Sequence, residues 1–250
     1  MGSPFIELPT LESTNNYALG QVRAGMAEHG TAFFAHEQTA GKGQMGRQWH
    51  SEKGANIAMS LVIKPSSTDL SKQFELSACI AVAVLKALSP LTGGDICLKW
   101  PNDIYWQERK MGGILIENIV SGKSNSGQHE WQWAVAGIGI NVNQTVFPEQ
   151  LVNPVSLKQV TGKAYDPPEL ARQICQTSSA GYRDLIDNGF NRIFAEYNDA
   201  LYRRNQIVRL RKENSVFSTT IKSVTRAGRL LTDNGSFEEE WDFGQVSWVN

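Results

Sequence analysis

The sequence predicts an α+β fold followed by a small all-β module. Helical and strand-like segments are mixed through residues 1–204, whereas short β-branched or alternating segments follow one another over residues 205–250. A length of 250 residues fits one large domain accompanied by a small one. We therefore expect two domains, with the boundary between residues 204 and 205.

Local start and stop signals predict the helices. Ser13 and Thr14 can cap a helix that Gly25 ends. The pair at 167–168 is Pro-Pro, which favours the first turn of a helix, and Asn-Gly at 188–189 breaks it. Between these two helices, the long apolar segment at residues 70–88 predicts a buried helix. The expected helices are residues 15–24, 70–88, 167–187 and 190–201.

Apolar and β-branched segments between turn residues predict the strands. In the first domain they are residues 31–36, 56–63, 96–100, 110–119 and 131–142, with a polar, glycine-rich loop at 38–53. The Ser/Gly-rich run 121–128 predicts a flexible hairpin tip. In the second domain the strands are residues 207–210, 216–224, 229–232, 236–241 and 246–249, which suggests a small barrel.

Composition excludes several classes of protein. Lys and Arg total 24 and Asp and Glu total 25, so the net charge of −1 argues against nucleic acid as the main partner. A hydrophobic content of 41% argues against disorder over the whole chain. No run of about 18 consecutive apolar residues occurs, so we expect no transmembrane helix and no membrane partner.

Cysteine and histidine usage fits a cytoplasmic protein that has no structural metal. Cys79, Cys97 and Cys175 are odd in number and widely spaced, which indicates free thiols in a reducing compartment. The four histidines lack metal-ligand spacing. Residues 1–7 lack the basic and apolar segments of a secretory signal.

Three clusters carry the candidate chemistry. Residues 41–49, Gly-Lys-Gly-Gln-Met-Gly-Arg-Gln-Trp, combine a pliable backbone with two cations, although the spacing matches neither a P-loop nor a dinucleotide-binding loop. Residues 99–103, Lys-Trp-Pro-Asn-Asp, are followed seven residues later by Lys-Met-Gly-Gly at 110–113, which would bring Asp103 near Lys110. Residues 137–143, Gly-Ile-Gly-Ile-Asn-Val-Asn, place two glycines in an apolar strand where a ligand can approach.

In this order, and with Ser-Thr-Asn at 13–15, the clusters resemble the catalytic module of biotin protein ligases over residues 5–205. The β module looks like the C-terminal SH3-like domain of that family. The resemblance implies a mixed β-sheet packed by helices, the class II synthetase-like biotin/lipoate ligase module, followed by a small SH3-like barrel. Only twelve residues precede Ser13, so we expect the short form of the family, without an N-terminal DNA-binding domain and without DNA as a partner.

The resemblance also implies a reaction. Biotin would be activated by ATP, with Mg²⁺ accompanying the nucleotide, to give biotinyl-5′-AMP and pyrophosphate. The biotinyl group would then pass to one lysine of a biotin carboxyl carrier protein, the domain that carries biotin in a biotin-dependent carboxylase. Whether the chain is a monomer or a homodimer stays open.

The family motif assigns roles residue by residue. Lys110 matches the essential lysine that bridges the biotin carboxylate and the phosphate, and Asp103 is the second catalytic candidate. The biotin-binding candidates are Ser13, Thr14, Asn15, Gln38, Gly41, Lys42, Gly43, Gln44, Lys110, Gly112, Gly113 and Gly137. The ATP- and adenylate-binding candidates are Lys42, Gln44, Arg47, Trp49, Asn102, Asp103, Lys110 and Asn141.

The glycine loop departs from the family pattern, in which arginines fill several positions. Here Lys42, Gln44 and Met45 stand at three of them, and Arg47 remains. A lysine retains the charge but lacks the bidentate fork of arginine, and Gln44 donates without charge. We therefore expect the loop to hold an adenylate less tightly than an arginine-rich loop.

Three other functions remain open. A lipoate–protein ligase or octanoyltransferase shares the fold, although the polar residues Ser-Thr-Asn at 13–15 favour a substrate with a polar ring over one with a plain acyl chain. A biotin-responsive transcription repressor would need a DNA-reading helix. A biotin-storage protein would bind biotin without releasing pyrophosphate from ATP.

Overall fold

The computed structural model describes residues 1–67, 69–121 and 130–249. The larger domain is built on a mixed sheet with the strand order β1-β2-β3-β7-β6-β5-β4. Strands β1 and β2 run parallel, and the other neighbouring pairs of this sheet are antiparallel. The strands are β1 (Phe5–Leu8), β2 (Ala32–Ala35), β3 (Ile57–Ile63), β4 (Ile96–Lys99), β5 (Asp103–Trp106), β6 (Arg109–Val120) and β7 (Trp131–Ile140).

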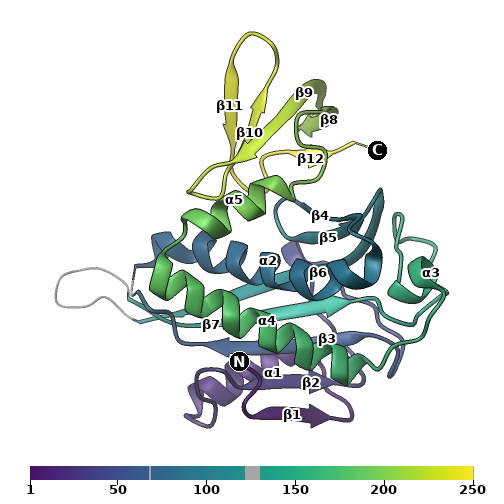
Figure 1. Cartoon of the computed structure of the whole chain (residues 1–250), viewed down its shortest axis with the longest axis vertical. Helices are drawn as coiled ribbons and strands as arrows, with labels where there is room; N and C mark the ends of the chain where they lie inside the picture. The colour runs from purple at the N-terminus through teal and green to yellow at the C-terminus, as the bar shows by residue number, and fades with distance from the viewer. Residues whose placement is uncertain (68, 122–129, 250) are drawn as a thin grey trace.

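Helices cover the two faces of this sheet unequally (Figure 1). Helices α2 (Gln73–Thr92), α4 (Pro167–Asn188) and α5 (Asn191–Asp199) pack on one face, together with the apolar side chains of β3 that alternate from Ile57 to Ile63. Helix α1 (Thr14–Arg23) packs on the opposite face through Ala18 and Leu19, which meet Val62 and Val135. The remainder of that second face is left free for a site.

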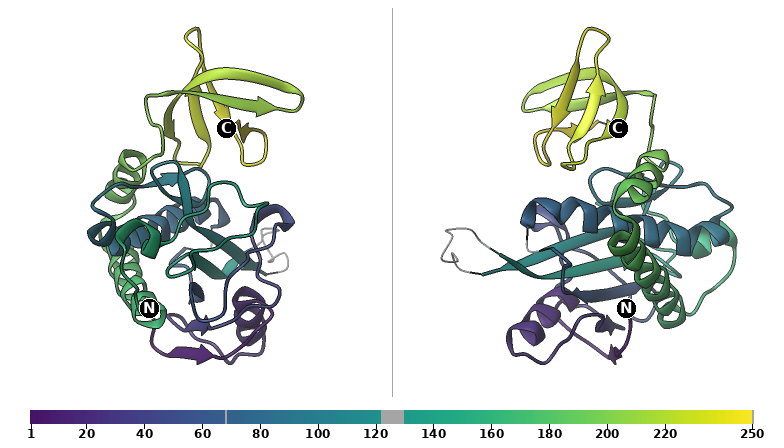
Figure 2. Two further views of the ribbon diagram at one scale, coloured as in Figure 1. Left: turned by 90° about the vertical axis from the view of Figure 1, so that its right-hand side faces the viewer. Right: turned by 60° about the vertical axis from the view of Figure 1, so that its left-hand side comes forward.

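The smaller domain is an antiparallel sheet with the strand order β11-β10-β9-β8-β12. Both views of Figure 2 show it at one end of the larger domain. Its strands are β8 (Ile207–Lys212), β9 (Ser215–Val224), β10 (Leu230–Asp233), β11 (Glu238–Trp241) and β12 (Ser247–Trp248). Leu210, Ile221 and Leu230 are fully buried at its centre. Trp241 joins them and donates its indole N–H to Thr232 Oγ1 at 2.9 Å. We call residues 205–249 the β module.

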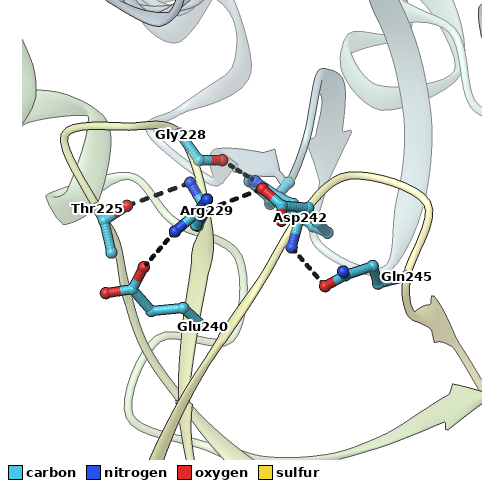
Figure 3. A network of polar contacts seen from close by, with 7 residues as sticks. Thr225, Gly228, Arg229, Glu240, Asp242 and Gln245 are labelled. Atoms are coloured by element: carbon cyan, nitrogen blue, oxygen red, sulfur yellow. Dashed lines mark hydrogen bonds and ion pairs between the residues drawn. The ribbon is translucent and has the colours of Figure 1, made fainter.

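Polar contacts fasten the β module to the larger domain. The buried amide of Asn198 bonds both backbone groups of Val224, at 2.6 and 3.2 Å. Trp100 Nε1 donates to the carbonyl of Gly228 at 2.9 Å. Two ion pairs hold the residue after Gly228 in place (Figure 3). The Arg229 guanidinium lies 2.8 Å from the Asp242 carboxylate and 3.5 Å from the Glu240 carboxylate.

The predicted helices and strands are confirmed, with shifted ends, and the α+β class is correct. The sequence did not reveal β1, β5 or the short helix α3 (Leu157–Thr161). Helix α2, preceded by the 3₁₀ turn η2 (Leu70–Lys72), continues to Thr92, past its expected end at residue 88. Pro90 lies in the last turn, so the helix continues for only two residues beyond the backbone hydrogen bond that a proline cannot make, and Gly93 ends it with φ 71°.

The segment Leu70–Thr92 is long and apolar enough to cross a membrane, but most of it is buried inside the fold, as expected for the core helix of a globular domain. Of the expected hairpin tip at residues 121–128, all but Ser121 lies outside the described residues. The three thiols are unpaired, as expected.

Candidate active site

A cavity of about 770 Å³ lies on the sheet face that α1 leaves open, and the β module forms part of its wall. Its floor is a row of register neighbours that crosses five strands, and the members of this row lie on one face of the sheet. The row contains Ala58, Gly139, Gly113, Asp103 and Lys99. The small residues at one end of this row leave space for the cavity. The charged residues Asp103 and Lys99 lie at its other end.

The two glycines of β7 leave room for neighbouring side chains. A Cβ at Gly137 would lie 2.3 Å from Asn15 Oδ1, and a Cβ at Gly139 would lie 2.6 Å from the indole of Trp49. The close approach predicted from these glycines is therefore made by Asn15 and Trp49. The indole of Trp49 lines the cavity, and its Nε1 is buried without a hydrogen-bond partner among the described residues.

A polar subsite lies at the start of α1. Ser13 caps this helix by accepting from the Asn16 N–H at 3.5 Å, so its hydroxyl proton stays free to donate. Gln38 Oε1 accepts from the backbone N–H and the hydroxyl of Thr14, at 2.8 and 3.1 Å. The Gln38 amide nitrogen is thereby left as a donor. Ser13, Thr14 and Gln38 all line the cavity.

A hydrogen-bond network behind this subsite fixes Asn15. Ser60 Oγ lies 2.6 Å from Asn15 Oδ1 and 2.8 Å from Thr14 Oγ1. Asn15 Nδ2 donates to Glu117 Oε2 at 2.8 Å and to the Leu115 carbonyl at 3.2 Å. Both ends of the Asn15 amide are thus occupied within the protein, so Asn15 orients Thr14 and Ser60. No motif in the sequence pointed to Ser60 or Glu117 as parts of the site.

Lys110 and Asp103 form an ion pair in the opposite half of the cavity. The distance from Lys110 Nζ to Asp103 Oδ1 is 2.7 Å, and their side chains are 33% and 25% exposed. The backbone of Lys110 bonds to two residues of a neighbouring segment, donating to Asn153 O at 2.8 Å and accepting from Val155 N at 2.9 Å. This pairing and the irregular register at the start of β6 direct the lysine into the cavity.

The two asparagines expected at the nucleotide end both line the cavity. The amide nitrogen of Asn102 donates to the Ile114 carbonyl, which ties the Trp-Pro-Asn-Asp turn to β6. Asn141 is buried, and its amide nitrogen donates to the Val155 carbonyl at 3.2 Å. The amide nitrogen of each asparagine is therefore used in a hydrogen bond within the protein. These two bonds stabilise the backbone around Lys110.

The glycine loop is a small hairpin over the cavity. Gly43 N donates to Arg47 O at 2.7 Å, and its tip is the 3₁₀ turn η1 (Gln44–Gly46). Lys42 Nζ lies 3.8 Å from Glu117 Oε1. The loop residues that line the cavity are Lys42, Gly43, Gln44, Met45, Arg47, Gln48 and Trp49.

Two of the expected site glycines lie behind the cavity wall. A Cβ at Gly41 would lie 2.5 Å from the Trp49 carbonyl oxygen. A Cβ at Gly112 would lie 2.5 Å from the Ile140 side chain and 2.6 Å from a backbone oxygen. Backbone packing accounts for both glycines, whereas Gly113 and Gly137 do line the cavity.

Two segments of the wall carried no recognisable motif in the sequence. One is the stretch before α3, which contributes Gln150, Leu151, Val152 and Pro154. The other is the end of the β module, which contributes Phe243, Gly244, Val246, Ser247 and Trp248. Among the described residues, no group of three or more histidines, cysteines or carboxylates is placed to hold a metal ion.

Comparison with known proteins decides the family. The model of the biotin/lipoate A/B protein ligase family matches residues 7–130. A biotin–[acetyl-CoA-carboxylase] ligase of Paracoccus denitrificans is 36% identical over 192 residues, which are 73% of this chain and 75% of that protein. The chain belongs to the biotin protein ligase family. The sequence-based expectation of this family is confirmed.

Three further similar proteins differ in how much of their own length this chain covers. The bifunctional ligase/repressor BirA of Escherichia coli is 27% identical over 98% of this chain and 74% of its own length. BirA of Bacillus subtilis is 35% identical over 77% of this chain, but the match spans only 58% of that repressor. A biotin protein ligase from Aquifex aeolicus, solved in complex with biotin and ATP, superposes with a TM-score of 0.80 at 26% identity and covers 98% of this chain and 97% of its own.

Proposed function

We propose that the chain is an ATP-dependent biotin–protein ligase that acts on a lysine of a biotin carboxyl carrier domain. One observation carries this proposal: a single cavity joins a polar subsite at Ser13, Thr14 and Gln38 to a lysine–aspartate pair, across a floor of small residues. The polar subsite suits the head of biotin. The pair suits the reacting carboxylate.

The donor pattern of the subsite supports biotin over lipoate. A ureido ring offers one carbonyl acceptor and two N–H donors. The Ser13 hydroxyl and the Gln38 amide nitrogen are free to donate to such a carbonyl, and Thr14 Oγ1 can accept. A dithiolane ring offers no carbonyl, so the hydroxyl proton of Ser13 and the amide nitrogen of Gln38 would lose this acceptor, at a cost of about 1–3 kcal/mol for a buried donor such as Ser13.

In the first step, an oxygen of the biotin carboxylate attacks the α-phosphorus of ATP. The bond from that phosphorus to the bridging oxygen breaks, and pyrophosphate leaves with the electron pair. Two anions must approach each other, so a cation between them lowers the barrier most. We assign this role to Lys110, which lines the cavity and pairs with Asp103 at 2.7 Å.

Mg²⁺ would accompany ATP, bound mainly by the phosphates as is usual for nucleotide enzymes. Asp103 is the carboxylate on the described cavity wall that such an ion could reach. The ion would neutralise charge on the leaving pyrophosphate. The protein's own contribution is the positioning of Lys110 and the nucleotide.

In the second step, the neutral amine of the carrier lysine attacks the acyl carbon of biotinyl-5′-AMP. An amide bond forms, the bond from the acyl carbon to the phosphate oxygen breaks, and AMP leaves. The attacking nitrogen must lose a proton. The Asp103 oxygen that does not bind Lys110 is our candidate acceptor for that proton.

Mass spectrometry of a purified carrier domain tests the proposal. After incubation with the protein, biotin, ATP and Mg²⁺, we expect one biotinyl group on one lysine, and none without ATP. Lipoate or octanoate replaces biotin in parallel reactions. Lipoylation without biotinylation would assign the chain to the lipoate branch. Biotin binding without pyrophosphate release would make it a storage protein.

A further inference from the structure

Lys99, at the end of β4, is enclosed by aromatic rings. Its Nζ lies 4.6 Å from the ring centroid of Tyr105, 5.2 Å from that of Tyr202 and 4.9 Å from that of Trp248. The Tyr105 hydroxyl is its hydrogen-bond partner at 3.3 Å. Among the described residues no carboxylate lies within 4.0 Å of it, so the ring faces and the Tyr105 hydroxyl are its direct contacts.

The rings that enclose Lys99 come from both domains. Tyr105 and Tyr202 belong to the larger domain, whereas Trp248 lies in β12, the last strand of the β module. The rings also contact one another, with centroids 5.3 Å apart for the two tyrosines and 5.5 Å apart for Tyr202 and Trp248. Trp248 Nε1 donates to the carbonyl of Trp100 at 3.3 Å. The end of the β module is therefore seated directly on residues 99–100.

Lys99 is also part of the floor of the cavity. It is the register neighbour of Asp103, and both Lys99 and Trp248 line the cavity wall. Burial lowers the pKa of Lys99, which Asp103 and Glu108 partly offset. The rings lie at the Asp103 end of the row, away from the small residues near Ser13.

We propose that Lys99 is a positioning residue, whose contact with Trp248 holds the last strand of the β module against the nucleotide end of the cavity and so sets the affinity for ATP. This inference rests on the proposed function. Lys99 acts on the nucleotide through the tryptophan. Among the described residues, the ring and cation contacts of this aromatic group involve none of Ser13, Thr14 and Gln38, so we expect the effect to be confined to one substrate.

The test compares KM for ATP, KM for biotin and kcat in biotin-dependent pyrophosphate release. Lys99→Met removes the charge but keeps the alkyl chain, and Trp248→Leu removes the ring but keeps the lysine. Each should raise KM for ATP about tenfold, the factor expected for the loss of one desolvated cation–π contact, with KM for biotin unchanged. The double variant should be no worse than the worse single variant, because the two residues act through one contact.

Two further variants serve as controls. Lys99→Arg should stay within about threefold of the unaltered protein, since a guanidinium also stacks on aromatic rings. Lys212→Met removes another lysine–tryptophan contact, in which Nζ lies 5.0 Å from the ring of Trp241 inside the β module, away from the cavity. It should leave all three kinetic constants unchanged.

Hydrogen exchange supplies a readout that does not depend on catalysis. The backbone N–H of Val249 donates to Arg209 at 3.0 Å, and its protection should fall in Lys99→Met and in Trp248→Leu but not in Lys212→Met. Unchanged ATP affinity in Trp248→Leu, with a loss in Lys99→Met, would overturn the proposal in favour of direct phosphate binding by Lys99. Additive effects in the double variant would overturn it as well. If the unaltered chain released no pyrophosphate with biotin, the proposed function would fail, and the exchange data would still decide whether the contact holds β12.

Discussion

The ammonium of Lys110 lies 2.7 Å from the carboxylate of Asp103, in the half of the cavity opposite the polar subsite at Ser13 and Gln38. Each residue comes from a different strand, and Asp103 is paired in register with Gly113, three residues after Lys110. Gly113 itself lines the cavity beside the pair, and a Cβ there would lie at ordinary van der Waals distance, 3.4 Å from Asp103 Oδ1 and 3.7 Å from Lys110 Nζ. The aspartate therefore orients the lysine at a point where the sheet backbone borders the cavity.

Replacement of Lys110 tests the first step. Lys110→Ala should lower biotin-dependent pyrophosphate release by at least about 10²-fold, the loss seen when one group that stabilises developing charge is removed. The side chain is one-third exposed and its partner Asp103 is one-quarter exposed, so the loss of this partly screened pair should lower the melting temperature by no more than about 4 °C. Pyrophosphate release at the unaltered rate in a folded variant would contradict the assigned role.

Replacement of Asp103 separates the two steps. An asparagine at this position can still accept a hydrogen bond from Lys110, but it cannot take a proton. Asp103→Asn should therefore lower adenylate formation about tenfold and lower transfer from supplied biotinyl-5′-AMP by about 100-fold or more, as expected for the loss of a general base. Equal losses in the two half-reactions would restrict Asp103 to holding Lys110.

Gly137 tests the biotin end of the cavity. Gly137→Ala would place a Cβ 2.3 Å from Asn15 Oδ1 and displace the side chain that orients Thr14 and Ser60. We expect KM for biotin to rise about tenfold or more, because buried polar groups lose their partners. KM for ATP should change far less. Isothermal titration with biotin alone measures the same loss without ATP.

Gly20→Ala is the matched control for this substitution. Gly20 is exposed in the middle of α1, and a Cβ there would meet nothing within 4 Å. This change should stabilise the protein by up to about 1 kcal/mol, because alanine favours the helix, and it should not affect either substrate. A similar loss of biotin affinity in both variants would mean that the effect comes from α1 as a whole.

Sequence motifs located the parts of the site where chemistry dictates residue type. Glycines inside an apolar strand predicted the floor at 137–139, and Lys110 and Asp103 were expected to meet. The wall formed by Phe243 and Trp248 could not be found in this way, because any large side chain can close a cavity. The same holds for Glu117, whose role depends on a partner about a hundred residues away.

The missed elements have a similar cause. Strand β5 follows directly on the polar turn at 99–103, and its four residues are too few for an alternating pattern to stand out. Strand β1 pairs in parallel with β2 at the edge of the sheet and is only half-buried, so its sequence shows no buried face. The unexpected end of α2 depends on packing of its last turn, which local propensity does not encode.

The cysteines give a prediction about reactivity. Burial raises the pKa of Cys79 and Cys97 to about 12 and that of Cys175 to about 11, above the ordinary value near 8.5. A raised pKa means less thiolate at a given pH, so at pH 8 the native protein should react with iodoacetamide at least about 100-fold more slowly than after unfolding in guanidinium. Mass spectrometry counts the modified thiols. Rapid modification of any of the three in the native protein would contradict the burial described here.

The last prediction concerns the glycine loop, whose Lys42 and Arg47 line the cavity beside the uncharged Gln44. A bound adenylate carries a phosphate, so each cation in the loop should slow its release, whereas an amide does less. Gln44→Arg should slow release of biotinyl-5′-AMP, and Lys42→Ala or Arg47→Ala should speed it, each by about threefold to tenfold because exposed pairs are partly screened.

Stopped-flow measurement of adenylate release, with limited proteolysis in parallel, checks both the charge and the ordering of this loop. Ligands should protect residues 38–53 from cleavage, since the loop must close over both substrates to make these contacts. Lys53→Ala is the matched control, because Lys53 belongs to the same loop but pairs with Glu37 at 3.0 Å, outside the residues that line the cavity. Its release rate should equal that of the unaltered protein. Equal rates in all variants, with unchanged cleavage when ligands are added, would mean that the loop packs in one conformation whatever is bound and does not control how long the adenylate stays.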